Sequence, residues 1–339
     1  MHEAALYTQN PDGTVTCRLC NHGCRIADGR SGRCGVRQNR DGRLYAASFG
    51  RISAEHIDPI EKKPLNHFLP GTLSYSLGSV GCNFSCTHCQ NWQLSRSAAS
   101  LFSLPYLSPE EAIHRALDAD ASSVSWTYNE PTISFEYTLE MGRRAHEAGL
   151  GTVYVTNGYM TIEALEALAP VLDAFRVDIK AFDDAFYREI CRAHLEPVLA
   201  STERARQLGM HVETVTLVIP GLNDSPEEID GLIRWVIDHL GDATPMHFTR
   251  FHPDYQMQDR PATPIATLER IYERARELGL LFPYLGNVSG HRYENTWCPR
   301  CGALLIERRL MHGRPTGIED GRCRTCGEVI PVVRRIPRS

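Results

Sequence analysis

Short apolar runs alternate with stretches of helical composition along the middle of the chain. Seven such runs, rich in β-branched and aromatic residues, predict strands. These are residues 73–80, 122–127, 151–156, 175–180, 212–220, 247–251 and 280–285. Because helical segments separate the strands, we expect parallel pairing with right-handed crossovers. The pattern therefore predicts an α/β fold, either an open doubly wound sheet or a full or partial barrel.

Three of the helical segments begin with the same signal. Ser108 and Ser225 each precede Pro-Glu-Glu, and Thr161 precedes Ile-Glu. Ser and Thr side chains accept hydrogen bonds from the free N–H groups of a first helical turn, and acidic residues are favoured there. We therefore expect helices to begin directly after these three residues.

Polar residues follow each of the seven predicted strands. In parallel α/β folds the loops after the carboxyl ends of the strands carry the chemistry. Seven strand ends with this pattern predict one shared pocket. The residues in question are, in chain order, 82–89, 128–130, Asn157, Asp178 with Lys180, Asn223 with Asp224, His252, and Asn287.

The composition is that of a globular protein. The chain has 339 residues, of which 42% are hydrophobic and 23% charged, and its formal net charge is −5. This charge provides no bulk attraction to nucleic acid or to anionic membranes, so neither is an expected partner. The N-terminus has no export signal and no apolar run is long enough to span a bilayer, which predicts a cytoplasmic location.

The cysteines divide the chain into three parts. There are 12 of them, and a reducing cytoplasm favours metal binding or catalysis over a disulfide framework. Four lie between residues 17 and 34, three between 82 and 89, and four between 298 and 326, with Cys191 alone. The expected organisation is a Cys-rich module over residues 1–60, a core over 61–290 and a second metal module over 291–339.

The three central cysteines have the spacing C-x3-C-x2-C directly after the first predicted strand. Cys82, Cys86 and Cys89 can hold three irons of a [4Fe–4S] cluster, which leaves the fourth iron open to a small molecule. Two alternatives remain. His88 can join the three thiolates in a tetrahedral zinc site, or the three thiols can be purely structural.

This motif, after a strand in a chain of βα repeats, resembles that of the radical S-adenosylmethionine (SAM) superfamily. Residues 82–86 and 89–92 resemble the branch that contains pyruvate formate-lyase activating enzymes, and the chain is most similar to the AmmeMemoRadiSam system radical enzyme family. The resemblance implies a partial (β/α)6 TIM-like barrel, here with small four-cysteine metal modules at both termini. It also implies reductive cleavage of SAM to methionine and a 5′-deoxyadenosyl radical.

The same resemblance implies cofactor contacts. Glu130 occupies the place of the acceptor in the family's Gly-Gly-Glu segment, although Tyr-Asn replaces Gly-Gly. Asp178 and Lys180 match its D-x-K feature and are expected at the ribose or carboxylate, the alternative being a structural ion pair at a strand end. Residues 218–224 resemble the segment that packs on adenine. No catalytic residue is assigned. The expected cofactor contacts are Asn129, Glu130, Asn157, Asp178, Lys180, Asn223 and His252.

The terminal cysteines predict two further metal sites. Two C-x2-C-Gly knuckles are typical of a zinc ribbon or a rubredoxin-type iron site, with zinc as the favoured structural metal. The N-terminal four fit either a small structural zinc module or an auxiliary iron–sulfur cluster. The C-terminal set is Cys298, Cys301, Cys323 and Cys326. The N-terminal set is Cys17, Cys20, Cys24 and Cys34.

The roles of two single residues, Cys191 and His67, stay open. Cys191 fits a buried thiol, or a radical-quenching or resolving residue. His67 precedes the first strand in a run that matches the family, without an assigned role.

The favoured function is hydrogen abstraction from an unidentified small-molecule or protein substrate. The alternatives are an activating enzyme that generates a radical on a protein partner, as activators of glycyl radical enzymes do, a non-catalytic zinc-ribbon binding protein, and a passive electron carrier. The expected cofactors are the [4Fe–4S] cluster, SAM, and zinc or rubredoxin-type iron. The expected partners are an electron donor of flavodoxin or ferredoxin type and, from the resemblance, Memo-like and AMMECR-like proteins.

Overall fold

A sheet of eight strands forms the centre of the molecule. In the computed structural model, which describes residues 1–336, their order is β14-β13-β12-β11-β10-β9-β8-β7. All neighbours are parallel except β7, which is antiparallel to β8. The strands are β7 (Ala54–Pro59), β8 (Leu73–Gly78), β9 (Ser123–Trp126), β10 (Gly151–Thr156), β11 (Ala174–Asp178), β12 (His211–Val218), β13 (Met246–Arg250) and β14 (Pro283–Gly286). All seven predicted strands are present, and β7 is an additional edge strand.

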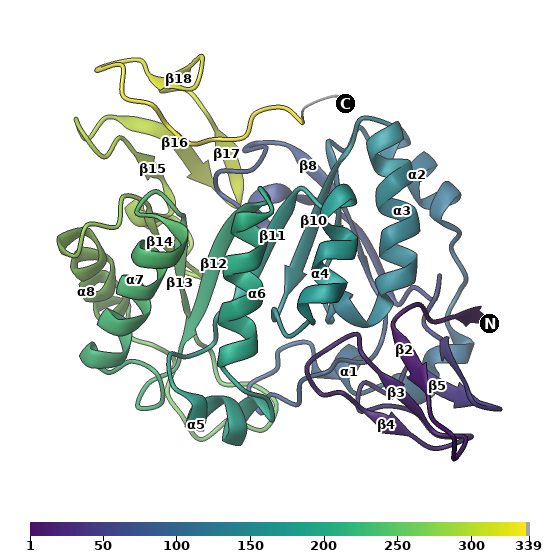
Figure 1. Cartoon of the computed structure of the whole chain (residues 1–339). Coiled ribbons are helices and arrows are strands. Elements are labelled where there is room, and N and C mark those ends of the chain that lie inside the picture. The colour runs from purple at the N-terminus through teal and green to yellow at the C-terminus, as the bar shows by residue number, and fades with distance from the viewer. Residues whose placement is uncertain (337–339) are drawn as a thin grey trace.

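Helices connect successive parallel strands, and α3, α4, α6 and α7 stand in a row on one side of the sheet (Figure 1). The predicted caps are confirmed: the side chains of Ser108, Thr161 and Ser225 accept backbone N–H bonds at the starts of α2, α4 and α7. The α-helices are α1 (Trp92–Ser95), α2 (Pro109–Asp118), α3 (Phe135–Glu147), α4 (Ile162–Leu168), α5 (Asp184–Phe186), α6 (Glu196–Gln207), α7 (Pro226–Leu240) and α8 (Ile265–Glu277). In the described part of the chain, every helix is too short or too polar to cross a bilayer.

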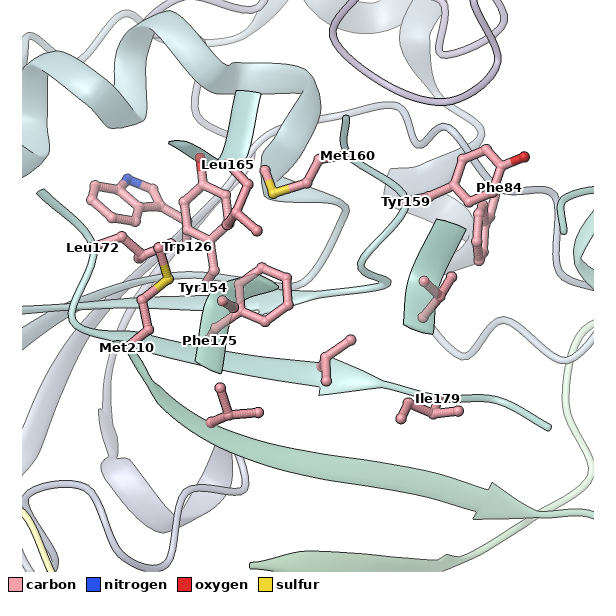
Figure 2. Packing of buried hydrophobic residues seen from close by; sticks show 14 of the residues in the cluster. Phe84, Trp126, Tyr154, Tyr159, Met160, Leu165, Leu172, Phe175, Ile179 and Met210 are labelled. Atoms are coloured by element: carbon pink, nitrogen blue, oxygen red, sulfur yellow. The ribbon is translucent and has the colours of Figure 1, made fainter. Parts of the chain in front are cut away.

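The main hydrophobic core lies between the sheet and these helices. Figure 2 shows Trp126, Tyr154 and Phe175 within it, and the rings of Trp126 and Tyr154 meet edge to face at 5.6 Å between centroids. Phe84, which follows the first central cysteine, also packs edge-on against Tyr159 at 5.2 Å. The loop that carries the central thiols is therefore anchored in the core.

The N-terminal segment is made of short antiparallel strands that share this core. Val15, Leu19 and Ile26 belong to the same buried cluster as the helices and the sheet. The strands are β1 (His2–Glu3), β2 (Tyr7–Gln9), β3 (Val15–Cys17), β4 (Arg25–Ile26), β5 (Arg37–Arg40) and β6 (Arg43–Ala46).

The C-terminal segment forms a second, smaller cluster against β14. Phe282 and Tyr284 of that region pack with Leu305, Ile306 and Ile318. The strands are β15 (Thr296–Trp297), β16 (Leu304–Arg309), β17 (His312–Arg314), β18 (Ile318–Glu319) and β19 (Arg322–Cys323). The short helices along the chain are η1 (Ile60–Lys62), η2 (Ala98–Ser103), η3 (Pro131–Ser134), η4 (Ala169–Val171), the π-helical turn η5 (Tyr187–Cys191) and η6 (Arg292–Glu294).

Candidate active site

The loop after β8 is held in place by backbone contacts from elsewhere in the chain. The N–H groups of Ser85 and Thr87 donate to the carbonyls of Cys191 and Ile190, at 2.9 and 3.2 Å, at the end of η5. Gly81 has φ +91°, and a Cβ there would lie 2.5 Å from the Cys34 carbonyl oxygen. Only glycine allows both this conformation and this close approach.

Cys82, Cys86 and Cys89 all line one cavity of about 330 Å³. The Phe84 N–H points at the Cys82 sulfur at 3.4 Å, and Ser95 Oγ lies 3.7 Å from the Cys89 sulfur. Within residues 1–336, the ligand atoms of the central thiols do not all lie within 4.8 Å of one another, whether or not His88 is included. A tetrahedral zinc site places thiolates about 3.8 Å apart. In this part of the chain the central thiols, with or without His88, are therefore not arranged around one tetrahedral ion.

Residues from the ends of all seven parallel strands meet in this cavity. A volume of this size is typical of a small-molecule site. Carboxylates, cations and apolar side chains line it together, which suits a ligand that carries an ammonium, a carboxylate and an aromatic base. Beyond the thiols, the lining includes Tyr128, Asn129, Glu130, Thr156, Asn157, Arg176, Asp178, Lys180, Leu217, Phe251, His252 and Asn287.

Glu130 is buried at the end of β9 and joins two strand ends. Its carboxylate accepts bonds from Thr132 and Thr156, and from the Asn157 N–H at 2.8 Å. Burial raises the pKa of Glu130, and these donors act in the opposite direction. The carboxylate is thus fixed at the cavity wall by its neighbours.

Tyr128 has a backbone conformation that is unusual for a residue other than glycine. Its φ is +71°, in the left-handed region that glycine favours. The Tyr128 hydroxyl donates to Asp58 at 2.6 Å, and Lys63 bonds to the same carboxylate at 2.6 Å. The hydrogen bond to Asp58, a residue of β7, stabilises Tyr128 in its strained backbone conformation.

Asp178 lies between two cations on β11 and the loop after it. Arg176 Nη1 is 2.6 Å and Lys180 Nζ 3.2 Å from its carboxylate oxygens. Burial opposes ionisation, yet Arg176 and Lys180 hold the pKa of Asp178 below its usual range. The three side chains share one face of the strand because they are two residues apart. The ion pair of the alternative interpretation is thus present, and it lines the cavity.

Of the remaining predicted contacts, Asn129, Asn157 and His252 line the cavity, whereas Asn223 does not. Asn129 and Asn157 also hold the loop of the central cysteines. Asn129 Nδ2 donates to the Gly81 carbonyl at 3.0 Å, and Asn157 Nδ2 donates to Asn83 Oδ1 at 2.7 Å. His252 is exposed at the cavity.

Asn223 is not among the lining residues of the described chain. Its side chain instead bonds to the Ile219 N–H and to the Lys180 and Leu217 carbonyls, at 2.6 to 2.8 Å. From this part of the chain, Val215 and Leu217 of β12 reach the cavity, whereas residues 218–224 do not.

Arg176 is a site residue that the sequence interpretation missed. It is 6% exposed and lines the cavity. The alternation that selected Asp178 and Lys180 extends back to Arg176 at the same two-residue step, so this signal was available. Arg250 at the end of β13 also reaches the cavity.

The four C-terminal cysteines form a compact site. Their sulfurs all lie within 4.8 Å of one another, with Cys298 to Cys326 at 3.6 Å and Cys301 to Cys323 at 3.7 Å. These distances match the roughly 3.8 Å that separates thiolates around one tetrahedral ion. The segment therefore has the geometry of a site for a single metal ion.

Cys191 and His67 both have structural surroundings. Cys191 is fully buried, and its carbonyl accepts from the Ser85 N–H in the loop of the central cysteines. His67 is also fully buried, and its ring nitrogens lie 2.6 Å from the Tyr284 hydroxyl and 3.1 Å from the Pro331 carbonyl. His67 therefore joins the core to the C-terminal segment at the opposite end of the sheet from the cavity.

Comparison with known proteins identifies the family of the chain and finds a close relative. The sequence model of the radical SAM superfamily matches residues 77–236. Uncharacterized protein MJ0808 of Methanocaldococcus jannaschii is 44% identical over 335 residues, which cover 98% of this chain and 100% of that protein.

More distant similarities are shorter. Benzylsuccinate synthase activating enzyme of Thauera aromatica is 24% identical over 43% of this chain and 46% of that enzyme. SuiB from Streptococcus suis superposes with a TM-score of 0.50 and 16% identity, over 67% of this chain and 52% of that one. The structural likeness shows a shared fold.

Proposed function

The chain belongs to the radical SAM superfamily and is a radical SAM enzyme, and on this premise we propose that Cys82, Cys86 and Cys89 hold its [4Fe–4S] cluster. One observation carries the proposal: the three thiols share a cavity of about 330 Å³ with residues from the ends of all the parallel strands. The family implies the cluster and SAM as cofactors. The eight-stranded, mostly parallel sheet supports the finer assignment of a partial barrel.

When bound, the cluster and SAM supply one-electron cleavage of the sulfonium and a carbon radical that removes a hydrogen atom from the substrate. The protein binds and orients. The Glu130 carboxylate would accept from the ammonium of the methionine part, while Lys180 and Arg176 would attract its carboxylate. Asp178 would orient Lys180 and Arg176 or accept from a ribose hydroxyl. Val155, Leu217 and Phe251 would provide apolar surface for the adenine and exclude water from it.

Anaerobic reconstitution tests this proposal. With a low-potential reductant and SAM, the wild-type protein is expected to release 5′-deoxyadenosine. A Cys82→Ala variant is expected to lose the cluster's charge-transfer absorption and the product together. If Cys82→Ala retains both, the assignment of the cluster to these cysteines is wrong.

A second candidate within the same chemistry is activation of a protein partner. The distant relatives named benzylsuccinate synthase activating enzyme and pyruvate formate-lyase-activating enzyme support it. Deuterated cell protein and a deuterated small-metabolite fraction, offered separately, distinguish the candidates. Deuterium in 5′-deoxyadenosine from the protein fraction alone favours activation, and deuterium from the metabolite fraction alone contradicts it.

We also propose that the C-terminal segment with the four cysteines is a zinc ribbon. The sulfur distances near 3.6 Å support one tetrahedral ion there, and its packing on β14 supports a structural role. Membership of the AmmeMemoRadiSam branch, with Memo-like and AMMECR-like partners and an electron donor of flavodoxin or ferredoxin type, is part of the same proposal. The assignment to this branch, together with its partners, rests on the sequence resemblance of residues 82–92. The non-catalytic alternative is not retained, because the chain is a radical SAM enzyme.

A further inference from the structure

A second large cavity lies outside the active site, where α8, β14 and the C-terminal segment lie next to one another (Figure 1). Its volume is about 200 Å³, so it suits a molecule smaller than a drug-sized ligand. We call it the α8 cavity, and its lining residues lie between positions 272 and 284 and between 295 and 302. The N-terminal cysteines line a much smaller cavity of about 20 Å³, with room for about one water molecule. These are Cys17, Cys20, Cys24 and Cys34. The α8 cavity can therefore admit an organic ligand, which the N-terminal cavity cannot.

The α8 cavity is separate from the active-site cavity. Phe282 and Tyr284 line it at the amino end of β14, whereas Asn287, after the carboxyl end of the same strand, lines the active-site cavity. No residue of the described chain lines both cavities. A molecule bound in the α8 cavity is therefore held at the other end of β14 from the central thiols, so it is not the substrate of the radical chemistry.

Arg276 of α8 gives this cavity a positive charge without a carboxylate partner. Its Nη1 donates to the carbonyls of Leu280 at 3.0 Å and Leu281 at 2.6 Å, which fixes the guanidinium. Within residues 1–336 it forms no ion pair, whereas Arg274 on the same helix is paired with Asp230 at 2.6 Å. In this part of the chain Nε and Nη2 of Arg276 also form no hydrogen bond. These two nitrogens are the edge of the guanidinium that can bind a carboxylate through two parallel hydrogen bonds.

The other free polar groups of the α8 cavity can also donate. The Tyr272 hydroxyl and Asn295 Nδ2 form no hydrogen bond with the described residues, while Asn295 Oδ1 already accepts from the Arg308 N–H at 2.6 Å. Among the described residues that line the cavity, none is Asp or Glu. Because the free groups are a guanidinium, an amide N–H and a hydroxyl, they fit a negatively charged acceptor.

Aromatic side chains that their neighbours hold in place form much of the remaining wall. The Tyr272 ring stacks on Tyr293, with 3.6 Å between the centroids and 8° between the planes. The Trp297 indole N–H donates to the Arg292 carbonyl at 3.0 Å. Phe282 is buried, and it lines the cavity together with Tyr272 and Trp297. A wall of fixed aromatic rings can bind another ring with little further loss of side-chain freedom.

From this geometry we propose that the α8 cavity is a binding site for a small aromatic carboxylate. The carboxylate of the ligand bonds to Nε and Nη2 of Arg276, with the Tyr272 hydroxyl and Asn295 Nδ2 as further donors. The ring of the ligand packs against Phe282 and Trp297. The ligand thus contacts both α8 and the C-terminal segment, and it undergoes no covalent change. This binding claim is independent of the proposed function, because the α8 cavity shares no lining residue with the active-site cavity.

Isothermal titration of the full-length, metal-loaded protein tests this proposal. Phenylacetate or indole-3-acetate is expected to bind with a dissociation constant of about 1 mM or lower. Phenylacetamide, a neutral molecule with the same ring, is expected to bind about tenfold or more weakly than phenylacetate. Arg276→Gln is expected to weaken phenylacetate binding about tenfold or more, because the charged donor pair is lost. The matched control is Arg270→Gln, an exposed position on the same helix outside the cavity, which is expected to leave the affinity unchanged.

A second variant keeps the test decisive if Arg276→Gln does not fold. Asn295→Asp retains the acceptor for the Arg308 N–H and places a negative charge in the cavity. Like charges repel, so the preference for phenylacetate over phenylacetamide is expected to disappear in this variant.

Three results would overturn the proposal. One is the absence of saturable binding of both carboxylates to the wild-type protein at up to about 10 mM. Another is equal affinity of the wild-type protein for phenylacetate and phenylacetamide, or an affinity for phenylacetate that the folded variants leave unchanged. The third is displacement of phenylacetate by inorganic phosphate at equal concentration, because a site that does not use the ring is a general anion site only.

Discussion

At the scale of single residues, the charges at the end of β11 combine a structural ion pair with the lining of the cavity. Arg176, Asp178 and Lys180 form one ion-paired row that faces the cavity. A buried charge that loses its partner is costly. Any substitution in this row therefore changes the charge that the cavity presents to a ligand, as well as the local packing.

Asp178→Asn is expected to weaken SAM binding about tenfold or more. The reason is that a hydrogen bond accepted by a charged carboxylate is worth about 1.5–3 kcal/mol. Isothermal titration of the reconstituted protein measures it. The matched control is Asp238→Asn, which removes one exposed carboxylate on α7. An unchanged SAM affinity, with normal iron content, would exclude Asp178 from the cofactor contacts.

His67 predicts a pH dependence of stability. Burial lowers its pKa to about 3, so below about pH 6.5 the unfolded chain takes up a proton that the folded chain does not. The free energy of unfolding should therefore decrease as the pH falls, by at most about 1.4 kcal/mol per pH unit from this group. Burial also lowers the pKa of His247, which adds to the effect in the same direction.

Urea unfolding of the metal-loaded protein between pH 7.5 and 5.5 measures this slope. His67→Gln is expected to reduce it, and the exposed His114→Gln on α2 to leave it unchanged. Equal slopes in wild type and His67→Gln would contradict the assignment of a neutral, buried His67.

At the scale of elements, the parallel strands were predictable because they are buried on both faces and appear as continuous apolar runs. The edge strand β7 was missed because half of its residues are exposed and only one is buried, so its sequence lacks such a run. Asn223 shows the limit at the site. Its position after a strand has the same signal as a cavity residue, but its amide is used to hold backbone groups of its own loop. Only the tertiary structure distinguishes the two roles.

The helix caps give a direct test at this scale. Ser225→Ala is expected to lower the free energy of unfolding by about 1 kcal/mol, because the Glu228 N–H at the start of α7 loses its acceptor. Denaturant unfolding checks this value. Ser289→Ala, at an exposed position outside any helix, is the control. A loss below about 0.3 kcal/mol would mean that water replaces the cap.

At the scale of the whole molecule, the C-terminal metal site supports one side of the core. Arg308 of β16 is 7% exposed, donates to the Asn66 carbonyl at 2.8 Å, and lies over the Tyr284 ring of β14. The C-terminal segment and the sheet are therefore joined by buried polar contacts as well as by apolar packing.

Cys298→Ser with Cys301→Ser is expected to remove one metal ion per chain and lower the melting temperature by several degrees, while the central cluster's absorption is retained. Metal analysis and calorimetry measure both. Arg300→Ala, between the same two cysteines, is the control. Loss of the central cluster in the double variant would show that the C-terminal segment also supports the active site.

The two edges of the open sheet have unequal protection against strand-to-strand association. On β7, Glu55, Asp58 and Pro59 disfavour pairing with another chain. β14 has the apolar sequence Pro-Tyr-Leu-Gly and depends on the C-terminal segment packed against it. If the four C-terminal cysteines are prevented from binding a metal ion, we therefore expect β14 to become exposed as an unpaired edge and the protein to self-associate.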